Sequence, residues 1–253
     1  FPLPEGSLPA VKLTPDEAQQ YRQLEAAIVN NTVAMERDYR ANPLQTTDST
    51  DWKLAKEKED FRVYKRLAKG QDQDQRLQPM VLCVGTIPGT IEDTLYGMYD
   101  ETTDGMRAVN TIINKSHLDG AVLALMDKSS EANPFRLLSL KWRINATPGG
   151  GMLIKYRDSF NLESMGITTD SEGERFGFFV LKSIDRPDFP PFSRSIAVRS
   201  QTMFCCIFRQ VNATTVGIYA KGIMNLGGDI SEWLCYNYAC PKMSAIIETT
   251  QCQ

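Results

Sequence analysis

The feature that most constrains this chain is a series of six strand-like runs between residues 118 and 224. Turn-forming residues separate the runs LDGAVLALM, FRLLSLKWRI, RDSFNLESMGI, RFGFFVLKSI, SQTMFCCIFRQ and TTVGIYAKGIM. No helical period lies between them, so each run is predicted to pair antiparallel with the next. The sequence therefore predicts a long antiparallel sheet of at least six strands.

Several of these runs are apolar at both alternating positions. Residues 203 to 208 read MFCCIF, residues 178 to 181 read FFVL, and residues 217 to 220 read GIYA. An antiparallel sheet with one wetted face would alternate apolar and polar residues instead. Either a helix covers each face of the sheet, or one face lines an apolar cavity.

Helices are predicted near both ends of the chain. Residues 14 to 17 read TPDE, a capping box with proline at the first helical position, and predict a helix over 15–40. Shorter helices are expected after Thr90 and over 102–113, and strands over 61–65 and PMVLCVGTI. Asp229 is expected to cap a closing helix, which Pro241 should kink or split. Helices gathered at the ends of a sheet predict an α+β fold.

Composition argues against several classes of function. A net charge of -3 gives no nucleic-acid footprint, and no apolar run is long enough to span a bilayer. None of the six cysteines forms a C-x-x-C pair and no secretory signal is recognisable, so we expect reduced thiols in the cytoplasm. The only histidine, His117, lies in a predicted turn, where we expect a surface role without catalysis. No metal site and no cofactor are expected.

Four stretches together resemble START (StAR-related lipid-transfer) domains, and most closely the START-like proteins of oomycetes that often carry a C-terminal FYVE zinc finger. The stretches are WKLAKEKEDFRVYKR, VGTIPGTIEDTLYGMY, NPFRLLSLKW and YRDSFNLESMGIT. The resemblance implies a helix-grip fold, in which a long curved antiparallel sheet wraps a C-terminal helix around an internal apolar cavity. It divides the chain into an N-terminal helical segment, 1–45, packed on a lipid-binding domain, 46–253.

The resemblance also interprets an adjacent pair of opposite charges, Arg157 and Asp158, which begins a strand after the Gly-rich run NATPGGGM. In START domains an Arg-Asp-Phe motif stands at the tunnel mouth, and here Ser159 replaces the phenylalanine. The pair would then mark the rim, with a gate loop formed by Gly149, Gly150, Gly151 and Met152. A surface ion pair is the alternative reading of the same two residues.

The leading hypothesis is a non-enzymatic lipid binder, which holds a sterol, phospholipid or acyl chain and transfers or senses it. We expect a monomer that touches membranes transiently. On the strand of residues 135–144, the Trp142 side is expected to face the interior, rather than the side of Lys141 and Arg143. The candidate lipid-binding residues are Trp142, Arg157, Asp158, Phe160, Phe178, Phe204, Phe208, Tyr219, Trp233 and Leu234.

Two alternatives belong to other classes of function. The fold could be a membrane-targeting or protein-interaction adaptor, whose cavity is filled by its own side chains. An enzyme is the third option, and its only support would be an ionisable group inside the cavity, such as Glu163.

Overall fold

The computed structural model describes residues 1–4, 6–43, 51–67, 79–147, 151, 154–228 and 230–244. In chain order the elements are α1 (Pro15–Ala41), β1 (Trp52–Lys58), β2 (Phe61–Arg66), β3 (Met80–Pro88), α3 (Ile91–Tyr96), α4 (Thr103–Ile113), β4 (His117–Asp127), β5 (Leu137–Asn145), β6 (Tyr156–Thr169), β7 (Arg175–Ser183), β8 (Ala197–Arg199), β9 (Gln201–Asn212), β10 (Thr215–Asn225) and α5 (Glu232–Ser244).

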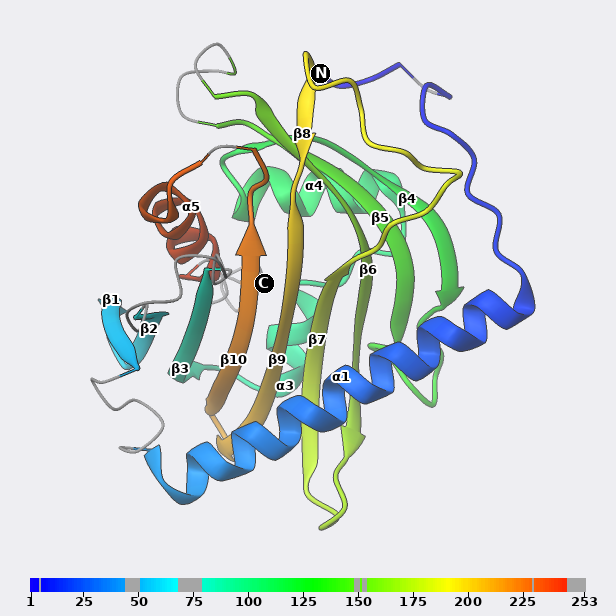
Figure 1. Cartoon of the computed structure of the whole chain (residues 1–253). Coiled ribbons are helices and arrows are strands. Elements are labelled where there is room, and N and C mark those ends of the chain that lie inside the picture. Colours follow the sequence, from blue (N-terminus) through cyan, green and yellow to red (C-terminus); the bar gives the residue numbers. More distant parts are fainter. Residues whose placement is uncertain are drawn as a thin grey trace.

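One sheet organises the molecule (Figure 1). Its strands follow the order β1-β2-β3-β10-β9-β7-β6-β5-β4, and every neighbouring pair on this path is antiparallel. The predicted antiparallel pairing of consecutive runs is confirmed, as is the α+β class. Two strands were not predicted: β1, at one edge, and the short β8, which pairs parallel with β6.

Helix α1 covers one side of the sheet, which we name the outer face. The predicted capping box is present, because Thr14 Oγ1 accepts from the Glu17 amide at 3.2 Å and Glu17 accepts from the Thr14 amide at 2.8 Å. The helix crosses the strands obliquely (Figure 1). It packs Ile28, Val29 and Val33 on buried side chains of β7 and β9, namely Phe176, Phe178, Val180, Cys205 and Ile207.

The N-terminal segment extends the outer cover beyond α1. Leu3, Leu8, Val11 and Leu13 pack against the buried outer side chains of β5 and β6. The Leu3 amide donates a 2.6 Å hydrogen bond to Asp119 Oδ2 on β4. This segment therefore buries apolar surface that α1 does not reach.

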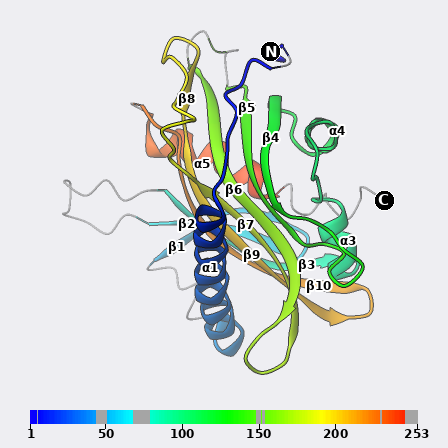
Figure 2. The same ribbon diagram turned by 90° about the vertical axis from the view of Figure 1, so that its right-hand side faces the viewer.

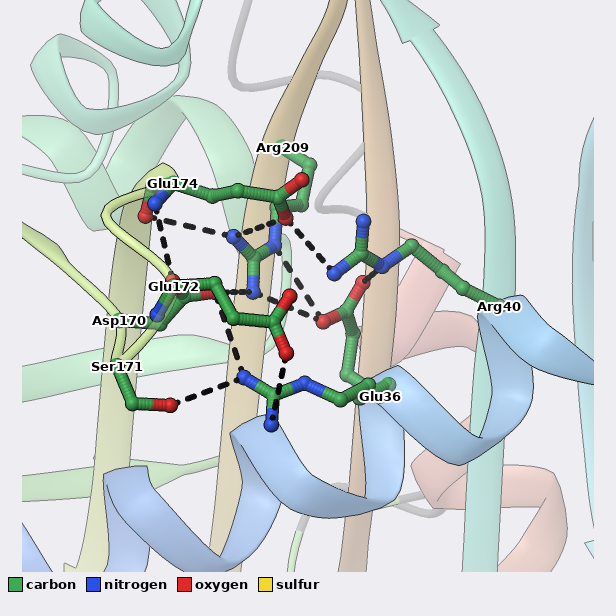
Figure 3. A network of polar contacts seen from close by, with 8 residues as sticks. Glu36, Arg40, Asp170, Ser171, Glu172, Glu174 and Arg209 are labelled. Atoms are coloured by element: carbon green, nitrogen blue, oxygen red, sulfur yellow. Dashed lines mark hydrogen bonds and ion pairs between the residues drawn. The ribbon is translucent and has the colours of Figure 1, made fainter.

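A network of charged side chains fixes the second half of α1 to the sheet (Figure 3). Arg209 on β9 places Nη2 3.1 Å from Glu36 on α1 and 2.8 Å from Asp170 in the β6–β7 turn. Arg40, one turn after Glu36, pairs with it at 2.7 Å and with Glu174 at 2.9 Å. Helix, turn and strand are thereby joined in one set of ion pairs.

The opposite side of the sheet, the inner face, carries α3, α4 and α5. Figure 2 shows α3 and α4 on the side away from α1. Ile91 and Leu95 of α3, with Cys235 and Tyr236 of α5, share a buried cluster with inner side chains of β2, β3, β9 and β10. Helices thus cover both faces, which explains the strands that are apolar at both alternating positions.

Helix α5 differs from its prediction in two respects. It begins at Glu232, and the Ser231 hydroxyl accepts from the Leu234 amide at 3.4 Å, so Ser231 acts as its N-cap. The predicted cap, Asp229, lies outside the described residues. The helix continues through Pro241 to Ser244, so this proline does not split it, and the kink expected there stays a prediction. No described helix is long and apolar enough to cross a membrane.

Candidate functional site

On β7 the apolar side chains of the inner face are more accessible to solvent than those of the outer face. Its outer side chains Phe176, Phe178 and Val180 are buried, whereas the inner side chains Phe179 and Leu181 are only partly buried. Adjacent strand residues point to opposite faces, so this alternation compares the two faces at one place. The inner face therefore keeps accessible apolar surface although helices lie on that side.

A cluster of four charged residues interrupts this inner face on β5 and β6. Lys141 lies with Nζ against a carboxylate oxygen of Asp100, and 2.5 Å from Glu163 Oε1. Arg143, two residues along the same strand, places Nη2 2.6 Å from Glu163 Oε2. Asp100 comes from the segment between α3 and α4. Three separate segments of the chain thus meet in one ionic group.

Burial governs the protonation of this cluster. It lowers the pKa of Lys141 to about 8, and the charge of Arg143 acts in the same direction, while Glu163 opposes both. Burial alone would raise the pKa of Glu163, but the charges of Arg143 and Lys141 outweigh it and the pKa is lowered. Glu163 is therefore a carboxylate at neutral pH.

Further polar groups line the inner side of β6. Asn161 accepts a 2.8 Å hydrogen bond from the Ser183 hydroxyl on β7. Arg157 Nη2 donates a hydrogen bond to the Gly227 carbonyl at 3.2 Å. Burial raises the pKa of Tyr238 on α5 to about 12, and the positive charge of Arg157 partly opposes this rise. The inner face of β6 is thus its polar side, with α5 close to one end.

The prediction that the Trp142 side of β5 faces the interior is wrong. Trp142 lies on the outer face, where its ring packs 5.5 Å from Phe192 and 6.4 Å from Phe1 between centroids. Its Nε1 donates to Asp158 at 3.2 Å. The residues of opposite parity, Lys141 and Arg143, face the helices instead.

Three more predicted lipid contacts share this outer face. The Phe160 ring stacks 4.5 Å from Phe189, Phe178 packs under α1, and Tyr219 lies 5.5 Å from the Tyr39 ring of α1. Because the sheet lies between them and α5, these side chains do not contribute to the space under that helix. The N-terminal segment and α1 occupy the surface that they would offer.

The predicted Arg157–Asp158 pair is divided between the two faces. Arg157 points inward, whereas Asp158 points outward and binds Arg199 Nη2 at 2.8 Å. Both side chains are buried, so the alternative reading as a surface ion pair is wrong, whereas a role of Arg157 at the rim stays a prediction. Successive residues of a strand alternate between its faces, which explains the separation.

The remaining predicted residues have mixed outcomes. Phe204 and Phe208 lie on the inner face of β9 in the cluster that includes α5. Trp233 on α5 is 69% exposed, and Leu234 is partly buried. His117 begins β4 and is partly buried rather than on the surface. The proposed roles of Phe204, Phe208, Trp233 and Leu234 in lipid binding stay predictions.

The predicted gate loop lies almost entirely outside the described residues, which exclude Gly149, Gly150 and Met152. Gly151 has a φ of 82°, and a Cβ added there would lie 2.8 Å from the Tyr156 ring. This conformation and this close approach both favour glycine. The gate itself stays a prediction.

A separate cavity of about 680 Å³ opens on the outer face, between α1, residues 132–136 and the end of β6. Of its three charged lining residues, Glu25 and Arg136 are ion-paired with each other, and Arg175 pairs with Glu92. Arg136 also binds Asp127 at 2.7 Å. It lies on the other side of the sheet from the charged cluster.

Sequence reasoning missed Asp100, Lys141 and Arg143 as members of a site. One signal was available: Lys141, Arg143 and Glu163 sit near the middle of two strongly apolar runs, and charges in such positions are rarely buried without partners. Asp100 gave no signal, because it lies in a connecting segment far from both strands in sequence.

No family model and no curated protein matches the chain. Several solved structures, by contrast, are similar to it in fold. Human StAR-related lipid transfer protein 5 is 13% identical, and the match covers 92% of this chain and 97% of that chain with a TM-score of 0.59. Human STARD10 is 14% identical, with 85% of this chain and 79% of that chain covered and a TM-score of 0.55.

A fragment of the STAR-related lipid transfer protein from Xanthomonas axonopodis is 15% identical, with 79% of this chain and 99% of that fragment covered and a TM-score of 0.54. Identities this low show the fold alone. The fold is therefore START-like, α+β with a long antiparallel sheet.

Proposed function

We propose that this chain is a non-enzymatic lipid-binding protein that holds one hydrophobic ligand between the inner face of the sheet and α5. The observation that carries the proposal is the contrast on β7, where the outer Val180 is fully buried and the inner Leu181 keeps accessible surface. A START-like fold supports it, since the similar solved structures are lipid transfer proteins by name.

Burial of the ligand's hydrocarbon supplies the binding energy, at about 25 cal/mol per Å² of apolar surface removed from water. Phe179, Leu181 and Phe204 would contribute apolar contacts from adjacent strands. A pocket of this kind uses a few polar groups to fix the ligand's orientation. Arg143 is suited to that role, because its side chain is 14% exposed whereas that of Lys141 is fully buried.

The charge balance of the cluster favours a neutral polar group on the ligand. Lys141 and Arg143 carry two positive charges, and Asp100 and Glu163 carry two negative ones. Within this described cluster, each positive charge is matched by a negative one, and none is left over for a phosphate. A hydroxyl can both donate to a carboxylate and accept from a guanidinium. We therefore place a hydroxyl-bearing lipid, such as a sterol, ahead of an anionic phospholipid.

The alternative functions have weaker support. An enzyme would need Glu163 as a base, but ion pairs with Lys141 and Arg143 lower its pKa and make it a weak one. In an adaptor with a self-filled cavity, Phe179 and Leu181 would be fully buried, but both keep accessible apolar surface. Its remaining support is the exposed Trp233 on α5, which suits a membrane interface.

The proposal also covers the oligomeric state, the cellular location, the domain division and the related proteins. We propose a monomer in the cytoplasm that meets membranes transiently, with transfer and sensing of lipid both open. The division into a helical segment, 1–45, and a lipid-binding domain, 46–253, also stays a proposal, as does kinship with oomycete START-like proteins. The four stretches quoted above support that kinship.

Native mass spectrometry of the protein, loaded from a total lipid extract, tests this function. We expect a single bound lipid per chain, identified after extraction as hydrophobic and carrying a hydroxyl. A protein that takes up no lipid from any extract, while remaining folded by circular dichroism, would favour the adaptor.

A further inference from the structure

The hairpin of β1 and β2, at one edge of the sheet, gathers lysines on one side. A regular strand would place Lys53 on one face and Lys56 and Lys58 on the other. The register shifts between Leu54 and Lys56, because Ala55 is an extra residue. Lys53 is then paired with Lys65, Lys56 with Val63 and Lys58 with Phe61, and all of these lie on the inner side of the hairpin.

We name this set, Lys53, Lys56, Lys58 and Lys65, the lysine face. The first three side chains are exposed and Lys65 is partly buried. No described carboxylate forms an ion pair with any of them. The nearby Glu57 lies on the other side of the hairpin and pairs with Arg62 at 2.7 Å. The bulge therefore separates these positive charges from Glu57, while Glu59 and Asp60 lie in the turn of the hairpin.

This arrangement costs stability within the fold. Lys53 and Lys65 stand directly opposite each other, and like charges in that position repel. Lysines also protect exposed sheet edges against pairing with other chains. Edge protection does not require lysines on a single face, nor one on β2, which is already paired on both sides. An anionic partner would account for both features.

The position of the lysine face indicates which partner. Lys65 Nζ lies 5.5 Å from the centre of the Tyr236 ring, so the face adjoins α5. Figure 1 shows the hairpin beside β3, whose inner side chains share a buried cluster with α5. The hairpin aromatics Trp52 and Tyr64 lie on the other side. Phe61 and Tyr236, on this side, are buried, so none of these rings is accessible for stacking with a nucleic-acid base.

We propose that the lysine face docks this protein on the surface of an anionic lipid bilayer, with α5 held against that surface. The proposal rests on the proposed lipid-binding function, since a ligand that leaves a bilayer must pass near the helix that covers it. Each lysine close to an anionic membrane strengthens binding about fivefold at low salt, which corresponds to roughly 1 kcal/mol.

Vesicle co-sedimentation tests the docking surface. The probes are phosphatidylcholine vesicles with and without about one-third phosphatidylserine, at low and at physiological ionic strength. The variant Lys53→Gln/Lys56→Gln/Lys58→Gln keeps Lys65 and its contact with the Tyr236 ring. We expect it to lose at least about tenfold in binding to the anionic vesicles, and to be no less stable than the wild type.

Two controls separate position from charge. Lys12→Gln/Lys115→Gln/Lys128→Gln removes the same charge from three other exposed lysines and should bind like the wild type. Lys56→Glu/Glu57→Lys keeps the net charge and moves one lysine to the other side of the hairpin, and it should bind more weakly. Equal loss in both triple variants, or equal binding to neutral and anionic vesicles, would overturn the proposal.

Two further readouts complete the test. Uptake of lipid presented without vesicles, from a cyclodextrin complex, should be unchanged in every variant. If that uptake fails in the wild type, the proposed function fails while the docking result stands on its own. Heparin serves as a soluble polyanion, and lysine-dependent binding of heparin without vesicle binding would also overturn the membrane assignment.

Discussion

Arg143 and Glu163 face each other across the inner side of β5 and β6, with 2.6 Å between Nη2 and Oε2. Both side chains project from the middle of apolar strands, toward the helices that cover this face. An ion pair in such a place contributes little net stability, because desolvation offsets the attraction. Orienting a ligand would explain why the Arg143–Glu163 pair is present, whereas packing alone would not.

Glu163→Gln should destabilise the protein by about 3–5 kcal/mol, because Lys141 and Arg143 would lose a buried counter-charge. Urea unfolding followed by circular dichroism measures this. Glu92→Gln is the matched control, since Glu92 pairs with Arg175 at 2.5 Å on the surface. That change should cost less than about 1 kcal/mol. Equal effects at the two positions would show that the cluster is not buried in solution.

Lys141 should titrate near pH 8, well below the ordinary lysine pKa of 10.5. Below pH 8 it is protonated in both the folded and the unfolded chain. Between about pH 8 and pH 10.5 the unfolded chain keeps a proton that the folded chain has lost, so this group makes the free energy of unfolding rise with pH there. NMR of ¹³C-dimethylated lysines measures the pKa, with Lys141→Met to assign the signal. A value near 10.5 would contradict the burial of Nζ.

Arg209→Met should loosen α1 from the sheet, because the buried Glu36 would lose its partner on β9 (Figure 3). We expect a loss of about 3–5 kcal/mol, and a smaller one for Arg209→Lys, which keeps the charge without the planar fork. Hydrogen exchange of α1 amides reports where the loss occurs. Unchanged protection of residues 28–40 would contradict a role of this network in fixing the helix.

His117→Ala should leave lipid binding unchanged, since no chemistry is assigned to the single histidine. The measurement is ligand affinity at neutral pH, with thermal unfolding as the check on folding. A variant that folds but no longer binds would reopen the enzymatic alternative.

Much of the architecture could be predicted from the sequence because it depends on local patterns. The TPDE capping box predicted the start of α1, and the six apolar runs became β4, β5, β6, β7, β9 and β10 in the predicted pairing. The strands β1 and β8 were missed. The first has charged residues at most positions, and the second is three residues long, so neither shows a strand pattern.

The faces of the sheet could not be assigned in the same way. On β5 both parities end up buried, Trp142 under the N-terminal segment and Lys141 against Asp100. Which parity faces α5 depends on where residues 6–13 and α1 lie, and these contacts join segments more than a hundred residues apart. The apolar side chain of Trp142 favoured a position facing the interior, but the N-terminal segment packs on the face where Trp142 lies.

The central claim is that a ligand occupies the inner side of the sheet, and two adjacent residues of β7 test it. Leu181→Trp adds a large side chain on the inner face, where accessible space remains, and Val180→Trp adds the same one under α1, where Val180 is fully buried. The measurement is uptake of a fluorescent sterol. We predict that Leu181→Trp stays folded and loses uptake, whereas Val180→Trp is destabilised by about 1–3 kcal/mol and still binds while folded. Full uptake by folded Leu181→Trp would contradict the account.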